Sequence, residues 1–406
     1  MLVPVQASAQ RSLRELQADF SRQLALAGPH DGAYVYDLTA KQALFSERAQ
    51  TMRPPASVEK LYTATTALEL MGPEARLYTT VYGVGHMAAG GVWEGSLYLR
   101  GGGDPTFGSS AFIDSHYRGL GASVSSLVAS LVRSSRIRRV TGSVYGDESY
   151  FDSLRGEPSS DYAWDPFLEG TLSALAFNRG ESGSERGPHA PAAYAAHELW
   201  STLKAYGVRI AGSYGAATTP AGATQLAQVA SPTVQQLVGL MLPPSDNFFA
   251  EMLVKDLGAR YGGSSPGTQP GTTAAGAAVV MKTVASVLGI HPQVVDGSGL
   301  SEADRTSPYQ VADLLAELAG TPVGEELRSS MAVAGRSGTL ELRMRHTRAA
   351  GNCQGKTGTL TGVSNLVGYC QAADGHTLVF AIFTDDIPTY TAHTFQDHMA
   401  ITVAGY

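Results

Sequence analysis

The chain has 406 residues and a net charge of −7, with 43% hydrophobic and 16% charged residues. This length predicts two or three packed units, and the composition excludes a disordered or fibrous chain. The acidic balance and the lack of a long Lys/Arg run argue against a nucleic-acid partner. No uninterrupted apolar run reaches the ~18 residues of a membrane-spanning helix, so we expect no such helix.

The first residues contain Ala7-Ser8-Ala9, the small-residue pattern that precedes a secretory cleavage point. The charged and apolar parts of a signal peptide are absent, so this segment is either a signal remnant or a misplaced start. We expect an exported protein, periplasmic or extracytoplasmic, whose signal is removed or truncated. A cytoplasmic location is the alternative, and peripheral association with the membrane or the cell wall stays open.

The first seventy residues predict a helix, a hairpin and a second helix. Apolar residues at three- and four-residue spacing indicate a helix over 8–27, and two β-rich runs at 32–38 and 42–47 indicate an antiparallel hairpin. Pro54-Pro55 then interrupts regular structure. Because the next apolar pattern is helical, Ser57 is predicted to open a helix.

From about residue 77 to residue 229 the pattern changes to short strands separated by glycine turns, which indicates an inserted smaller α+β domain. The strands expected there are 95–100, 140–145 and 208–214, and the helices are 123–133 and 192–206.

The remaining chain predicts helices first and strands last. The helices are expected at 233–242, 247–257, 273–288 and 390–403, and the strands at 351–359, 363–372 and 376–385. The first two and last three strands would form a five-stranded antiparallel sheet flanked by helices, an α+β fold. The expected limits are 1–78 and 233–406 for the two parts of the catalytic domain, and 79–232 for the insert.

Three short motifs occur in order along the chain. They are Ser57-Val58-Glu59-Lys60, Ser245-Asp246-Asn247 and Lys356-Thr357-Gly358-Thr359. Together they form the known signature of penicillin-binding proteins and class A β-lactamases. A second Ser-x-x-Lys match, Ser201 to Lys204, lies inside a predicted helix of the insert, so we expect Ser201 to face solvent.

The motif residues are suited to acyl transfer from a serine. Ser57 and Lys60 are three residues apart on one helix face, which brings an amine close to a hydroxyl. Lys60 would act as the base if burial and the charge of Lys356 keep it neutral. Ser245 would relay a proton to the leaving amine, and Asn247 would hold Lys60 and the substrate amide.

The third motif would bind the end of the substrate. Lys356, Thr357 and Thr359 are expected to bind its terminal carboxylate, and Gly358 to let the substrate pack against the strand. The backbone N–H groups of Ser57 and Thr359 are the natural oxyanion-hole donors.

Over nearly its whole length the chain resembles the class C low-molecular-mass penicillin-binding proteins, a D-Ala-D-Ala carboxypeptidase and endopeptidase family. Besides the motifs, the resemblance rests on residues 99–106, 173–178, 296–301 and 355–360. It implies a penicillin-binding/β-lactamase-like transpeptidase fold, an acyl-enzyme on Ser57, peptidoglycan peptides as substrate and covalent inhibition by β-lactams. Two features depart from the family: the insert looks like one domain where relatives usually have two, and Asp304 stands where relatives usually have Asn.

The same resemblance suggests that Asp147 contacts an amino group of the substrate side chain, with a solvated strand-end carboxylate as the equal alternative. The ten histidines lack metal-ligand spacing, so neither metal nor cofactor is expected. Two other functions compete. A β-lactamase would need a deacylating Glu-x-x-Leu-Asn context, which is absent between the second and third motifs, and intact motifs argue against a non-catalytic β-lactam- or wall-binding sensor. The choice between carboxypeptidase and endopeptidase action stays open.

Cys353 and Cys370 lie symmetrically about a turn centred between Thr361 and Gly362. In a simple hairpin the two would face each other, with Cβ atoms within the ~3.5–4.5 Å that a disulfide needs. An exported protein would oxidise them. Two buried free thiols are the alternative if the register slips by one residue or the protein is cytoplasmic.

Overall fold

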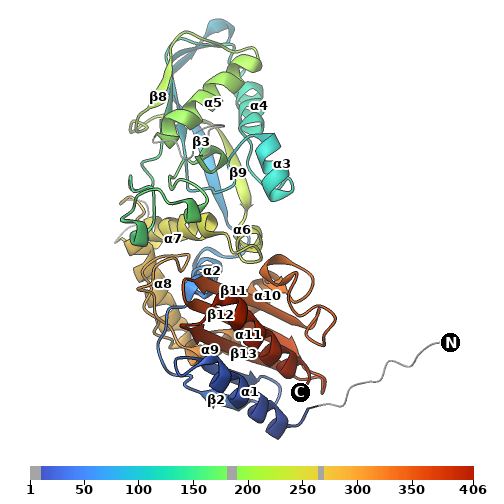
Figure 1. The fold of residues 1–406 in the computed structure, drawn as a ribbon. Coiled ribbons are helices and arrows are strands. Elements are labelled where there is room, and N and C mark those ends of the chain that lie inside the picture. The colour runs from blue at the N-terminus through green and yellow to red at the C-terminus, as the bar shows by residue number, and fades with distance from the viewer. Residues whose placement is uncertain (1–10, 181–189, 264–268) are drawn as a thin grey trace, which may run out of the picture.

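The computed structural model describes residues 11–180, 190–263 and 269–406, so the segment with the expected signal remnant lies outside the described residues. Figure 1 shows an elongated molecule with a sheet at each end and helices between them. Among the described residues, no helix has both the length and the apolar character needed to cross a membrane.

The first sheet has six strands in the order β10-β11-β12-β13-β1-β2, all pairs antiparallel. The strands are β1 (Gly32–Asp37), β2 (Gln42–Glu47), β10 (Ala332–Val333), β11 (Cys353–Leu360), β12 (Val363–Gln371) and β13 (Thr377–Asp385). The five predicted strands are confirmed. The prediction missed β10, because two residues cannot show an alternating pattern.

Helices cover both faces of this sheet. Helices α1 (Leu13–Ala27) and α11 (Thr389–Ala404) pack together on one face, and α9 (Pro308–Leu318) packs on the other. In β13 the even-numbered residues, such as Phe380, join the core beneath α1 and α11, whereas odd-numbered ones, such as Phe383, join the core beneath α9. This alternation is the period-2 pattern of a strand buried on both faces.

The second sheet has seven strands: β7-β5-β4-β3-β9 form its main path, and β6 joins β4 to β8. The strands are β3 (Arg76–Ala88), β4 (Val92–Arg100), β5 (Arg139–Val140), β6 (Val144–Asp147), β7 (Arg209–Ile210), β8 (Tyr214–Ala216) and β9 (Thr224–Thr233). Helices α3 (Ser110–Tyr117), α4 (Val124–Ser135) and α5 (Pro191–Ala205) lie at this end of the molecule. The limits 79–232 for an inserted domain stay a prediction.

A group of helices joins the two ends. They are α2 (Lys60–Met71), α6 (Val234–Met241), α7 (Asn247–Tyr261), α8 (Thr273–Leu288) and α10 (Pro322–Ser329). Short 3-10 helices are η1 (Ala56–Glu59), η2 (Ala89–Gly91), η3 (Pro158–Ser160), η4 (Pro166–Leu168), η5 (Phe177–Gly180) and η6 (Gly338–Leu340). Helix α7 is buried from Phe248 to Ala259, which makes it the central helix of the molecule.

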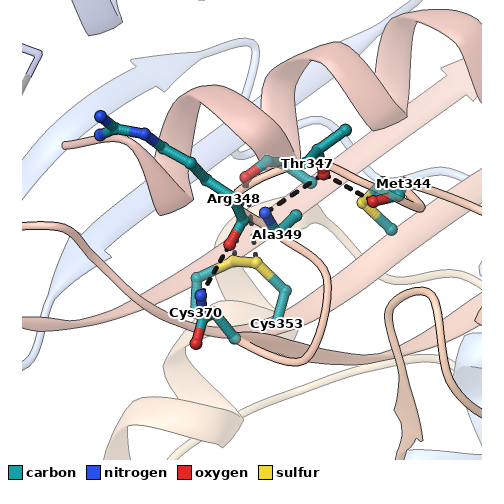
Figure 2. The surroundings of a disulfide bond; sticks show 8 residues. Met344, Thr347, Arg348, Ala349, Cys353 and Cys370 are labelled. Atoms are coloured by element: carbon teal, nitrogen blue, oxygen red, sulfur yellow. Dashed lines mark hydrogen bonds between the residues drawn. A yellow bond between two sulfur atoms is a disulfide. The ribbon is translucent and has the colours of Figure 1, made fainter. Parts of the chain in front are cut away.

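The two cysteines are joined by a disulfide, as the hairpin register predicts. Cys353 is paired with Cys370 across β11 and β12, with Cα atoms 4.1 Å apart. Figure 2 shows the bridge beside the turn from Met344 to Ala349, where the backbone N–H of Cys353 donates to the carbonyl of Ala349 at 2.9 Å. The bridge therefore braces the first residue of the strand that carries Lys356.

Candidate active site

Ser57 and Lys60 lie where a 3-10 helix passes into an α-helix. Ser57 belongs to η1 and is partly exposed, whereas Lys60 begins α2 and is fully buried. The Lys60 Nζ donates to the Ser57 Oγ at 2.9 Å. The preceding Ala56 has φ +48°, a left-handed conformation that costs about 1–2 kcal/mol outside glycine. Such strain persists only where the surrounding structure imposes it, as at many active sites.

The turn before Ser57 is fixed by the first sheet. Asn365 of β12 donates from its Nδ2 to the carbonyls of Pro54 and Pro55, at 3.0 and 2.9 Å. A Cβ on Gly358 would lie 2.4 Å from the Pro55 carbonyl oxygen. The protein's own backbone before Ser57 therefore leaves no room for a side chain there, and the expected packing of substrate against Gly358 stays a prediction.

The Lys60 amine has three hydrogen-bond acceptors: Ser57, the Asn247 Oδ1 at 2.6 Å and the Ser298 carbonyl at 2.7 Å. Burial lowers the pKa of Lys60 to about 8, although nearby carboxyl groups act in the opposite direction. Those carboxyl groups belong to Asp296, Glu251, Asp246 and Glu169. Of the two causes expected to keep Lys60 neutral, burial is the largest one found, whereas the charge of Lys356 is not among the causes of the shift.

Lys356 lies in a different environment. Its amine is fully buried and donates to the Ser245 Oγ and to the Thr357 carbonyl, both at 2.7 Å. Burial, followed by repulsion from Lys60, holds the pKa of Lys356 well below its usual range. Ser245 has φ +68°, and among the described contacts its hydroxyl bonds Lys356 rather than Lys60.

The other residues of the third motif lie beside Lys356 on β11. The Thr357 hydroxyl donates to the Thr339 hydroxyl at 2.9 Å, and Thr359 is exposed. The structure thus brings Ser57, Lys60 and Asn247 into one group, with Ser245 and Lys356 hydrogen-bonded beside them.

The loop 296–301 supplies the Ser298 carbonyl, a hydrogen-bond acceptor for Lys60 that was not predicted from the sequence. Asp296 accepts from the backbone N–H groups of Ser298, Gly299 and Ser301 at 2.6–3.1 Å. Glu251 of α7 accepts from the N–H groups of Gly297 and Ser298, both at 2.9 Å, and so shares the Ser298 N–H with Asp296. Two carboxyl groups therefore hold the loop so that one carbonyl points at Lys60. In the sequence, the Asp-Gly-Ser-Gly stretch was the feature from which this contact could have been suspected.

Two further acidic side chains, Glu59 and Asp304, are fully buried beside this loop. Burial is the largest cause that raises the pKa of both, with Asp296 next, and it brings the pKa of Asp304 to about 11. The Asp304 Oδ1 accepts from the Val295 N–H at 2.6 Å. Its Oδ2 meets no donor among the described residues, as expected for a protonated carboxyl that donates toward Asp296.

Asp147 lies at the end of β6 in the second sheet and is 1% exposed. The alternative of a solvated carboxylate is therefore wrong. Its oxygens accept from the backbone N–H groups of Ser149 at 2.9 Å and Thr219 at 2.8 Å. Burial alone would raise the pKa of Asp147, but these bonds outweigh it and the pKa is lowered. Asp147 lines a cavity of about 300 Å³ with Glu148 and Asp152, and none of its described hydrogen bonds reaches the lysine group.

The alternative Ser-x-x-Lys match does not form a serine–lysine pair. Ser201 is exposed on α5, and the Lys204 Nζ lies over the Trp200 ring, 3.9 Å from its centroid. Within the described ranges no three His, Cys, Asp or Glu side chains are arranged to hold a metal ion.

Fold and site together define a penicillin-binding serine enzyme. The sequence model of the D-Ala-D-Ala carboxypeptidase 3 (S13) family matches residues 13–170 and 167–405, so the chain belongs to this family. It is a serine-type D-Ala-D-Ala carboxypeptidase/endopeptidase, as the sequence resemblance implies.

Curated relatives agree with this assignment, and a solved structure agrees with the fold. The chain is 29% identical to a D-alanyl-D-alanine carboxypeptidase of Actinomadura sp. (strain R39), over 97% of this chain and 85% of the relative. It is also 29% identical to the carboxypeptidase DacB of Mycolicibacterium smegmatis, over 95% and 83%. The structure of penicillin-binding protein 4 from Haemophilus influenzae superposes with a TM-score of 0.76 at 21% identity, over 94% and 97%. That protein has also been solved with a β-lactam. The predicted fold class is confirmed.

Proposed function

We propose that Ser57 is the nucleophile of this carboxypeptidase and that Lys60 is its general base. The observation that carries the proposal is the 2.9 Å contact between the Lys60 amine and the Ser57 hydroxyl. With a pKa of about 8, a useful fraction of Lys60 is neutral near neutral pH. Neutral Lys60 takes the proton of Ser57 as its oxygen attacks the carbonyl carbon of the penultimate D-Ala.

The remaining motif residues complete the reaction. The N–H groups of Ser57 and Thr359 stabilise the oxyanion, and Ser245 relays the proton held by Lys60 to the leaving D-Ala amine as the peptide bond breaks. The acyl-enzyme on Ser57 is then hydrolysed by water. A β-lactam follows the same first step, but its ring-opened leaving group stays attached, so covalent inhibition results.

Lys356, with Thr357 and Thr359, binds the terminal carboxylate of a peptidoglycan peptide. A carboxylate that arrives at Lys356 raises the pKa of that amine, since opposite charge favours the protonated form. A protonated Lys356 in turn disfavours a proton on Lys60. Substrate binding therefore frees the base, which reconciles the buried, neutral-leaning Lys356 with its role as counter-charge.

The test replaces Ser57 by Ala and measures covalent labelling by a fluorescent penicillin together with D-Ala release from a peptide ending in D-Ala-D-Ala. Ser57→Ala should abolish both while the protein stays folded, and the matched control Ser201→Ala should change neither. Labelling that survives in Ser57→Ala would overturn the assignment. Labelling of the parent without D-Ala release would favour a sensor, and rapid release of hydrolysed penicillin would favour a β-lactamase.

Asp147 is our candidate for recognition of an amino group on the substrate side chain. It is supported by a buried carboxylate on a cavity that Glu148 and Asp152 also line. Asp147→Asn should raise KM for a peptide with a free side-chain amine and leave the acetylated peptide unaffected. An equal effect on both peptides would refute the role.

We further propose that the protein is exported. The Cys353–Cys370 bridge supports this, because disulfides persist in oxidising compartments. Recovery of the protein only in the cytoplasmic fraction, with two free thiols per chain, would contradict it.

A further inference from the structure

Arg179 is a buried cation outside the three motifs. Its guanidinium is 11% exposed and donates from Nη2 to the Asp246 carboxylate and from Nε to the Tyr117 hydroxyl at 2.8 Å. A third contact runs from Nη1 to the Glu169 carbonyl at 3.4 Å. The residue thus connects segments near positions 117, 169 and 246, and Asp246 is the middle residue of the second motif.

Aromatic rings enclose the same guanidinium. The Arg179 Cζ lies 5.4–5.5 Å from the centroids of Tyr117, Phe248 and Phe249, within the range of cation–π attraction. Burial alone would lower the pKa of Arg179, but Asp246 and Tyr117 outweigh it and raise the pKa overall. Arg179 therefore stays charged although water is largely excluded.

The backbone that presents Arg179 is strained. Asn178 and Arg179 both have left-handed φ angles, +50° and +57°, inside η5. Each costs about 1–2 kcal/mol, which the surrounding structure must offset. Asn178 is held by accepting the Ser109 N–H at its Oδ1, at 2.8 Å.

From Arg179 a short series of contacts leads to the base. The Asp246 Oδ1 caps α7 by accepting the Phe249 N–H at 3.0 Å, while its Oδ2 faces Arg179. The next residue, Asn247, accepts from Lys60 at 2.6 Å and donates to the Phe167 carbonyl at 2.7 Å. The start of α7, which places Asn247 against Lys60, is therefore held from outside by Arg179.

We propose that Arg179 is a positioning residue for acylation, which holds Asp246 and through it Asn247 and the Lys60 amine. This inference rests on the proposed roles of Ser57 and Lys60. The region between β6 and α5 then contributes to the geometry of the active site, although none of the three motifs lies there.

Arg179 also has an electrostatic effect on the base. The groups that surround Lys60 are the carboxyls of Glu59, Asp246, Glu251, Asp296 and Glu169 and the amine of Lys356. Arg179 pairs with the carboxylate of Asp246 and, at 3.8 Å, with that of Glu169, so its removal would leave both carboxylates unpaired near Lys60. An unpaired carboxylate favours the protonated lysine, and the acidic limb of the acylation profile should then move to higher pH.

The experiment measures the acylation rate by fluorescent penicillin against pH for the full chain. Arg179→Met should lower the rate about tenfold or more through misplacement of Asn247, and move the acidic limb up by about half a pH unit. Arg179→Lys keeps the charge, so the acidic limb of its pH profile should lie where the parent's does, while its acylation rate stays below that of the parent. Addition of Asp246→Asn to Arg179→Met should move the acidic limb back toward its position in the parent.

The matched control is Arg260→Met on α7, the helix that begins at Asn247. The Arg260 Nε pairs with Asp256 at 2.7 Å, and neither residue belongs to a motif. It should lower the melting temperature without moving the limb. A parental rate and limb in folded Arg179→Met would overturn the proposal. If that variant does not fold, Asp246→Asn alone decides, because a parental rate there would show that the Arg179 contact does not position the base. Failure of the proposed function is distinguished by labelling that persists in Ser57→Ala.

Discussion

The two buried lysines of the active site differ in their surroundings. Each amine contacts a serine hydroxyl and a backbone carbonyl, but only Lys60 also contacts the Asn247 side chain and has carboxyl groups nearby. Both amines are equally buried, and burial lowers the pKa of both. Only Lys60 has carboxylates that oppose the effect, so its pKa stays near 8.

This difference shows that the protonation of each lysine is set by its surroundings and not by its motif. The carboxylates that hold the loop 296–301 also tune the base, because Asp296 and Glu251 both bind the loop and raise the pKa of Lys60. Lys356 has no carboxyl group among the causes of its pKa shift, so the carboxylate of an incoming substrate would be the group that raises its pKa. The two amines should therefore respond differently to the same substitution.

The largest difference is expected when each lysine is replaced by Met. Lys60→Met removes the base and should slow acylation by about a thousandfold for every substrate. Lys356→Met removes the counter-charge and should slow acylation about a hundredfold, mainly for peptides with a free terminal carboxylate. The measurement compares D-Ala release from a peptide acid with cleavage of its C-terminal amide.

The parent enzyme provides the control for this comparison. It should cleave the amide far more slowly than the acid, and Lys356→Met should bring the two closer together. Equal cleavage of acid and amide by the parent would mean that Lys356 does not bind the carboxylate.

The hairpins of the first sheet could be predicted from sequence because their signals are local, although the pairing of β1 with β13 joins the two ends of the chain. Strands β1 and β2, like β11 and β12, are joined by short turns, and their alternation fixes which residues face each other. The pairing of Cys353 with Cys370 follows from the position of one turn. The motif residues were found for the same reason, since each motif is contiguous in the chain.

The second sheet could be predicted only in part, and the supporting residues of the site have no local signal. Strand β3 pairs with β9, which follows far along the chain, and β5 and β7 are only two residues long. Asn365 and Arg179 act on Pro54 and Asp246, partners distant in sequence. Burial of Glu59 and Asp304 is likewise a property of the tertiary fold, so their altered acidity could not be foreseen.

The disulfide extends the comparison to stability, because it braces only the strand of Lys356. Replacement of both Cys353 and Cys370 by Ala should lower the free energy of unfolding by about 3 kcal/mol, the chain-entropy value for a loop of this length. Urea unfolding of the oxidised protein and the double variant gives the difference. Reductant should destabilise the parent and leave the variant unchanged, and equal stability of parent and variant in the absence of reductant would refute the role.

The smallest effect is expected at Asp304, in the carboxyl group cluster behind Lys60. Its pKa is raised to about 11 in the folded protein, so the folded state keeps a proton that the unfolded state loses above pH ~4. The contribution of Asp304 to stability therefore falls as pH rises from about 4 toward 11, because this group binds less of a proton in the unfolded state than in the folded state over that range. Asn cannot ionise, but its amide can accept from Val295 and donate toward Asp296 as the protonated acid does.

Asp304→Asn should therefore match the parent at pH ~4 and exceed it increasingly above that value, by about 2 kcal/mol at pH ~8, since neighbouring carboxyls share part of the shift. Chemical denaturation at several pH values measures this difference. Asp114→Asn, an exposed position on α3, is the matched control and should give a difference that does not change with pH. A pH-independent difference for Asp304→Asn would mean that Asp304 is ionised in the folded protein. The carboxyl groups near Lys60 would then carry one more negative charge. The difference between the pKa values of Lys60 and Lys356 would have to be larger than their hydrogen bonds indicate.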